Sequence, residues 1–210
     1  MKKSVNHILS SSLFGAALLM ASSMASAASL SLQPAGLTVT PGMAFSVDLQ
    51  VSGVGSPAPG SIGGFDLEIS FDPAVLSLQS YSLGGFLGDV GQSEAADFSL
   101  LQSGKIQLTE ISFLATAALD ALQPGSFKLA TINFMAATAT PPGGSPVSIT
   151  RLWSLGLATG LPLDDVTLSD VTVTAVPEAS TCALMLAGLA LLAATARRRR
   201  GGPATGPPAR

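Results

Sequence analysis

Residue types on which many catalytic and metal sites depend are almost missing from this chain. Its 210 residues include one histidine and one cysteine, His7 and Cys182. Neither lies between residues 28 and 175, the segment that we expect to form the folded domain. An intramolecular disulfide is therefore excluded. Within that segment, Ser-His-Asp catalysis, Cys-His catalysis and His-ligated metals are excluded as well.

Basic residues are also scarce in the segment 28–175. It carries twelve acidic residues against Lys105, Lys128 and Arg151, which gives a formal net charge of −9. A field of this sign repels nucleic acid and anionic lipid, because their phosphates need Lys or Arg for neutralisation. We therefore expect no nucleic-acid partner.

The first 27 residues have the pattern of a secretory signal peptide. Lys2 and Lys3 precede an apolar core at 13–20, and Ala25 and Ala27 are the small residues that a signal peptidase requires. We expect cleavage directly after residue 27. The alternative is an uncleaved anchor, which the short apolar core disfavours because a membrane span needs about 20 apolar residues.

The segment 28–175 has the periodicity of β-strands throughout. Residues 45–51 and 65–71 alternate strictly between apolar and polar side chains, which places the apolar groups of each strand on one face. Weaker strands are expected at 30–39 (interrupted at Pro34), 75–81, 97–102, 105–113, 126–134, 147–153 and 168–174. No sustained helical stripe is present. The pattern predicts an all-β domain in which two antiparallel sheets pack as a sandwich.

Two of these strands show a change of phase. The apolar residues switch faces between Leu108 and Ile111, and again between Leu129 and Ile132. One extra residue in each strand would restore a single apolar face, so we predict a β-bulge or a strand bend in both. The alternative is a strand buried on both faces.

The segment 62–76, IGGFDLEISFDPAVL, resembles the cohesin family. The matching positions are Gly64, Phe65, Ile69, Phe71, Asp72, Pro73, Val75 and Leu76. The resemblance implies a cohesin-like jelly roll over most of residues 30–174. Cohesins proper bind dockerin modules, and related sandwiches bind polysaccharide. Asp72 is expected to cap local backbone N–H groups at the turn, and the acidic strand face before it is expected to be solvent-facing.

Tyr81 and Trp153 are the only tyrosine and tryptophan of the chain. Exposed aromatic rings stack on sugars, so both are candidate ligand contacts. For Trp153 we favour packing in the core or between the sheets, because large aromatic side chains dominate such cores.

The densest carboxylate cluster contains Asp164, Asp165 and Asp170. Calcium takes six to eight oxygen ligands, so these residues are weak calcium candidates. Their spacing matches no EF-hand loop, and a solvated turn is the favoured interpretation. No other cofactor is expected.

The C-terminal region joins a short polar motif, an apolar run and an arginine cluster. The motif is Val176-Pro177-Glu178-Ala179-Ser180, the uncharged run is 181–196, and the cluster is Arg197-Arg198-Arg199-Arg200. This order resembles the PEP-CTERM sorting signal. The resemblance implies recognition by an exosortase, with cleavage near the motif.

Within this signal, Ala179 departs from the usual second proline. The run 181–196 is expected to form a transmembrane helix whose arginines stay cytoplasmic, and 201–210 is expected to be a disordered tail. A plain C-terminal anchor is the alternative.

Together these patterns predict a protein exported through the inner membrane and anchored there before processing. Its final location would be the cell surface or the extracellular space. We expect a non-catalytic interaction or matrix module, with exosortase as a partner and another surface protein as a further one. The alternative is an exopolysaccharide-binding module. A glycoside hydrolase, which needs two suitably placed carboxyl groups, is a distant third.

Overall fold

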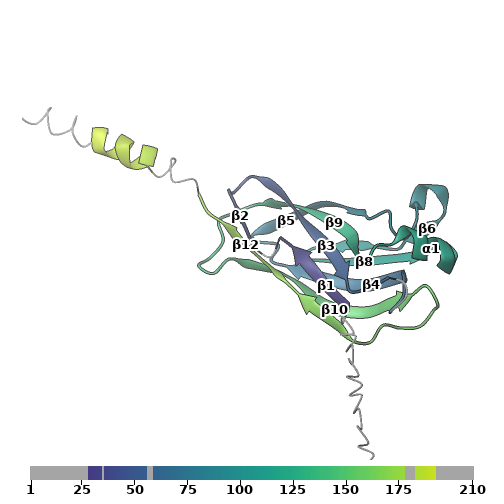
Figure 1. Cartoon of the computed structure of the whole chain (residues 1–210). Coiled ribbons are helices and arrows are strands. Elements are labelled where there is room, and N and C mark those ends of the chain that lie inside the picture. Colours follow the sequence, from purple (N-terminus) through teal and green to yellow (C-terminus); the bar gives the residue numbers. More distant parts are fainter. Residues whose placement is uncertain (1–27, 35, 56–58, 178–182, 193–210) are drawn as a thin grey trace, which may run out of the picture.

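Two β-sheets pack face to face in the computed structural model, which describes residues 28–34, 36–55, 59–177 and 183–192 (Figure 1). The strands are β1 (Ala28–Gln33), β2 (Gly36–Val39), β3 (Ala44–Ser52), β4 (Ile62–Phe71), β5 (Leu76–Leu83), β6 (Ala95–Asp97), β7 (Leu100–Gln102), β8 (Lys105–Ser112), β9 (Ser126–Ala136), β10 (Ser145–Leu157), β11 (Val166–Ser169) and β12 (Val171–Ala175). The expected signal peptide with Ala25 and Ala27, the motif residues Glu178–Ser180, the arginine cluster and the expected tail lie outside the described residues.

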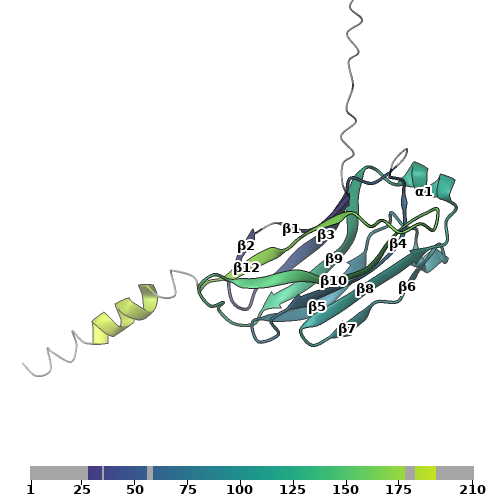
Figure 2. The same cartoon turned by 90° about the horizontal axis from the view of Figure 1, so that it is seen from below.

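Sheet A has the strand order β11-β1-β3-β9-β5, and sheet B has the order β2-β12-β10-β4-β8-β6, with β7 also paired to β8 (Figure 2). The predicted two-sheet sandwich is confirmed. The prediction of purely antiparallel sheets is wrong, because β1 pairs with β11 and β2 with β12 in parallel. The first strand is interrupted at Pro34, as predicted, and the last one is interrupted at Asp170. The first and the last segment of the domain therefore each contribute one strand to sheet A and one strand to sheet B.

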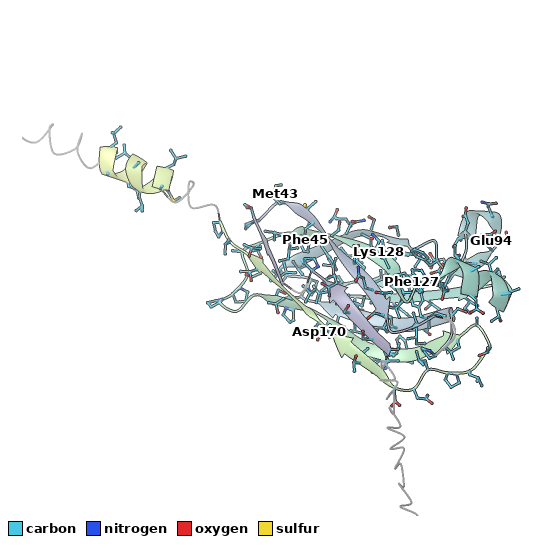
Figure 3. All side chains as sticks on the ribbon, in the orientation of Figure 1. Met43, Phe45, Glu94, Phe127, Lys128 and Asp170 are labelled. Atoms are coloured by element: carbon cyan, nitrogen blue, oxygen red, sulfur yellow. The ribbon has the colours of Figure 1, made fainter. Side chains whose placement is uncertain are left out.

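The core lies between the sheets, where side chains from both fill the space (Figure 3). The two strictly alternating strands, β3 and β4, supply its centre, and Leu49, Leu67 and Ile69 are fully buried. The ring of Phe134 packs against Phe45 and Phe71, with centroids 5.6 Å and 5.1 Å away. Each such buried side chain contributes about 1.5–3 kcal/mol, so the sandwich is held without a disulfide.

Of the two predicted β-bulges, one is confirmed and the other is wrong. In β9, Ala130 faces Leu49 and Lys128 faces Gln50, so Leu129 is the additional residue and is buried. Strand β8 pairs with β4 without any shift in register. Strand β8 stays regular, and its change of phase is resolved by burying an acid, Glu110.

One short helix, α1 (Thr116–Leu122), connects β8 to β9 and was not predicted. Only Leu119 of this helix is buried. A seven-residue helix with one core residue has too few apolar positions to produce a helical stripe in the sequence. The 3-10 turn η1 (Val90–Gln92) lies between β5 and β6.

Residues 183–192 form a helix within the predicted transmembrane run 181–196. Its leucines are exposed, Leu184 by 74%. None of the helices in the described ranges combines the length and the apolar composition that a membrane crossing requires.

Candidate functional sites on the sandwich

The outward side of β10, β4, β8 and β7, which we call the sheet B face, carries an ordered row of polar side chains. Lys105 Nζ donates to Glu68 Oε2 at 2.9 Å. Asp66 Oδ1 accepts from Gln107 Nε2 at 2.8 Å and from Thr109 Oγ1 at 2.9 Å. The hydrogen bond from Lys105 holds the pKa of Glu68 below its usual value. These acids point outward as expected, and donors on β8 fix their positions.

Large apolar side chains lie on the same face. Leu100 is 54% exposed, Ile111 46% and Trp153 48%. Strand β10 is bulged at Trp153, between Leu152 and Ser154. The prediction that Trp153 packs in the core is therefore wrong. Trp153 is the additional residue of a bulge, so it lies outside the regular alternation of inward and outward side chains along β10.

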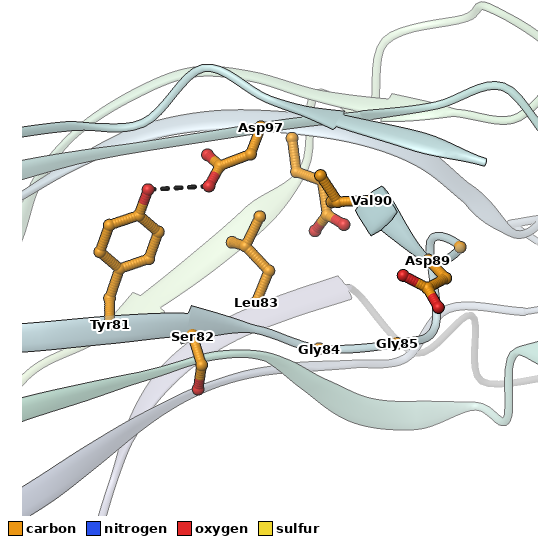
Figure 4. A pocket seen from close by; sticks show the side chains of 10 residues that line it. Tyr81, Ser82, Leu83, Gly84, Gly85, Asp89, Val90 and Asp97 are labelled. Atoms are coloured by element: carbon orange, nitrogen blue, oxygen red, sulfur yellow. Dashed lines mark hydrogen bonds between the residues drawn. The ribbon is translucent and has the colours of Figure 1, made fainter. Parts of the chain in front are cut away.

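A hollow of about 590 Å³ opens between the free edge of sheet A at β5 and strands β6 and β8 of sheet B. We call it the edge hollow. Figure 4 shows Tyr81 and Leu83 of β5 pointing toward Asp97, whereas Ser82 points away. Val90 of the turn η1 also lines it.

A hydrogen bond crosses the hollow from one sheet to the other. Tyr81 Oη donates to Asp97 Oδ2 at 2.8 Å (Figure 4), and Asp97 Oδ1 accepts from the backbone N–H of Ser99 at 2.8 Å. Burial opposes the charge on Asp97, but the hydrogen bonds from Ser99 and Tyr81 outweigh it and hold the pKa of Asp97 below its usual value. Burial, followed by the contact with Asp97, raises the pKa of Tyr81. Asp97 is therefore an ionised acceptor in a fixed orientation.

Glu110 lies across the β6–β8 pair from Asp97 and lines the same hollow. It is 0% exposed, and neither carboxyl oxygen has a hydrogen-bond partner among the described residues. Burial and, secondarily, the charge of Asp97 raise the pKa of Glu110 to about 8. The group is therefore mostly neutral at pH 7. Sequence reasoning assigned Glu110 no role, although it is in phase with the buried Ile106 and Leu108.

The two aromatic candidates do not form one site. Tyr81 lines the edge hollow between the sheets, whereas Trp153 lies on the sheet B face on β10, which β4 and β8 separate from β6. A ligand at one therefore need not contact the other.

The three calcium candidates are not gathered either. Asp164 and Asp165 precede β11, whereas Asp170 follows it and accepts from the backbone N–H of Ile149 at 2.8 Å. No group of three or more His, Cys, Asp or Glu side chains in the described ranges is arranged to hold a metal ion.

The fold defines a domain of two packed β-sheets. The family model of the cohesin domain matches residues 30–175, and that of the PEP-CTERM protein-sorting motif matches residues 175–200. The chain belongs to the cohesin family, whose domain is a protein-interaction module, and it carries a PEP-CTERM motif.

Solved structures show the same fold. A type I cohesin–dockerin complex from Clostridium thermocellum has 12% sequence identity and a TM-score of 0.58, and covers 71% of this chain and 99% of that one. The sixth cohesin of Acetivibrio cellulolyticus scaffoldin B, in complex with a dockerin, has 18% identity and a TM-score of 0.55 with the same coverage. The seventh type I cohesin of a Pseudobacteroides cellulosolvens scaffoldin has 16% identity and a TM-score of 0.56, covering 72% and 94%. Comparison with curated proteins gave no match.

Proposed function

We propose that the chain is an exported, non-catalytic interaction module that binds a protein partner of the dockerin class through its sheet B face. The observation that carries this proposal is the exposure of Trp153, Ile111 and Leu100 beside an ordered row of polar side chains. Exposed aromatic and aliphatic anchors within a polar surround are typical of protein interfaces. The solved cohesin–dockerin complexes of the same fold support the class of partner.

The polar row prepares this face for binding. Asp66 and Glu68 are already held by donors on β8, so less side-chain freedom is lost when a partner docks. The charge of the domain, −9 over residues 28–175, favours a partner with a basic surface and speeds its approach.

Delivery to the envelope is the second part of the proposal. Residues 1–27 direct export, and the cohesin domain at 28–175 is the exported part. Val176 and Pro177 follow β12 directly and begin the motif that an exosortase reads. The run 181–196 then holds the chain in the inner membrane, and Arg197–Arg200 remain cytoplasmic. Processing releases or transfers the sandwich to the cell surface, where it serves as a matrix or adhesive module.

The test is a binding measurement against dockerin modules of the organism of origin, made with the full chain and two substitutions. Trp153→Ala should weaken binding by about tenfold or more, because buried interface tryptophans are frequent hot spots. Leu168→Ala removes a similarly exposed side chain from sheet A and should leave the affinity unchanged. Equal losses in both variants, or no binding to any dockerin, would contradict the proposal.

A second candidate function, binding of exopolysaccharide, is favoured by the edge hollow. Its polar groups and its tyrosine lie apart from the sheet B face, so the two functions are compatible in one domain.

A further inference from the structure

The edge hollow contains a carboxyl group whose hydrogen-bonding capacity is unused. Glu110 is fully buried and lines the hollow, yet neither of its oxygens has a partner among the described residues. Buried polar groups in native proteins are nearly always hydrogen-bonded. Because Glu110 lines the hollow, the missing partner is expected to be a group bound there.

The other polar groups of the hollow restrict the chemistry of that partner. Asp97 is an oriented acceptor: Tyr81 donates to one of its oxygens, and the backbone N–H of Ser99 donates to the other. Lining residues include no lysine, arginine or histidine, so nothing there would neutralise an anion. The acids that line the hollow, Asp89, Asp97 and Glu110, are not arranged as a group that could hold a divalent cation. A neutral ligand with several hydroxyl groups needs neither a basic side chain nor a set of metal ligands, and it can donate to Asp97 and accept from Glu110.

The walls of the hollow are suited to a small ring. Tyr81 contributes an aromatic side chain that is held in place by Asp97. The rim at Gly84 and Gly85 has no side chains, and a Cβ added at Gly85 would meet nothing within 4 Å. Packing therefore does not require a glycine at position 85. Because Gly85 has no side chain, the entrance of the hollow stays wide. The volume, about 590 Å³, is within the range of small-molecule sites.

We propose that the edge hollow is a binding site for a neutral sugar residue of a polysaccharide. Asp97 accepts from a ligand hydroxyl, Glu110 donates to another, and the ring of Tyr81 covers one side of the sugar. This proposal deepens the second candidate function and is independent of the dockerin-binding face.

The chain offers one spectroscopic probe for each site, because it has a single tyrosine and a single tryptophan. The full chain is labelled with fluorotyrosine and fluorotryptophan and kept in a detergent without a sugar head group. Glucose, galactose, mannose and N-acetylglucosamine are titrated separately, with sorbitol as an acyclic control. We expect a saturable shift of the Tyr81 fluorine resonance with at least one cyclic sugar, and no shift of Trp153.

Variants test whether the acids of the hollow make the contacts. Glu110→Leu removes both oxygens at similar volume and should weaken the sugar affinity by about tenfold or more, while Glu110→Gln retains a donor and should lose less. Asp97→Asn should also weaken binding. Asp72→Asn is the matched control, because the Asp72 carboxylate lies at an exposed turn, where it accepts a hydrogen bond from Ala74 N–H. This variant should leave the sugar affinity unchanged.

Several outcomes would overturn the proposal. These are the absence of a Tyr81 shift with all four sugars, an equal shift with sorbitol, a shift caused only by calcium chloride, or affinity unchanged in Glu110→Leu and Asp97→Asn. Movement of Trp153 instead of Tyr81 would place the sugar on the sheet B face. Dockerin binding is measured separately with Trp153→Ala, so failure of either proposal is recognised without the other.

Discussion

Glu110 places an ionisable group in the interior of the sandwich. Its pKa is raised from an ordinary value of 4.5 to about 8, first by burial and then by the charge of Asp97. Between these two values the folded chain keeps a proton that the unfolded chain has released. The free energy of unfolding therefore decreases as the pH rises from 4.5 through 8.

This linkage gives a prediction for Glu110→Gln, which imitates the protonated form. At about 1.4 kcal/mol per pKa unit, the variant should be more stable than the wild type by several kcal/mol at pH 9 and similar to it near pH 4.5. Urea unfolding of both proteins from pH 4.5 to 9 measures the difference. The lowered pKa values of Glu68 and Asp97 affect stability only below their ordinary values, outside this window.

The surface variant Asp165→Asn serves as the control, and its stability should follow that of the wild type at every pH. Parallel curves for wild type and Glu110→Gln across the whole range would show that Glu110 does not titrate as the structure indicates.

Among the secondary-structure elements, α1 is followed by a buried side chain that bonds to the start of β4. Gln123, directly after the helix, accepts from Ile62 N–H and donates to Ile62 C=O, both at 2.7 Å, and donates to Phe86 C=O at 3.0 Å. The side chain thereby replaces a neighbouring strand at the start of β4. It is buried, being only 7% exposed.

We predict that Gln123→Ala lowers the free energy of unfolding by about 2–4 kcal/mol, because it leaves buried backbone groups of Ile62 without partners. Gln102→Ala, at the exposed end of β7, should change stability by less than about 0.5 kcal/mol. Denaturant midpoints compare the two variants. A loss at Gln102 as large as that at Gln123 would contradict this role.

Local sequence patterns correctly predicted the elements that depend only on nearby residues. Strict alternation identified β3 and β4, Pro34 marked the break between β1 and β2, and the phase change at Leu129 revealed the bulge of β9. The same reasoning failed at β8, which pairs with β4 and β6 without a shift in register and turns Glu110 inward. A phase change in the sequence does not indicate whether the strand forms a bulge, as in β9, or buries a polar residue, as in β8.

The candidate sites were less accessible to prediction for a related reason. Tyr81 was selected because it is the only tyrosine, but its partner Asp97 and the orphan Glu110 become neighbours only through strand pairing. The exposure of Trp153 results from the bulge of β10, which depends on the register with β4. The parallel pairs β1–β11 and β2–β12 likewise join segments more than 120 residues apart.

For the whole molecule, the sorting motif gives a prediction about processing. Glu178→Ala, or replacement of Arg197–Arg200 by alanine, should leave the exported chain with its C-terminal segment attached. Intact-mass spectrometry of the protein recovered from the producing organism measures this. Glu94→Ala, an acid substitution within the sandwich, should not change processing. The same mature mass in all variants would contradict recognition of the motif.

The connection between β12 and the sorting motif has a mechanical consequence. Strand β12 lies between β2 and β10, and Val176 N–H still donates to Val39 C=O at 2.9 Å. A pull on the C-terminal side of Val176 acts along the axis of β12, so its hydrogen bonds on both edges resist together in shear. Under tension the rate of forced unfolding decides how long a domain survives. In single-molecule pulling, we expect a higher rupture force from this end than from β7, which would unzip from β8 bond by bond; equal forces would contradict this. A domain held at that end would remain folded under a load that unfolds one held at β7.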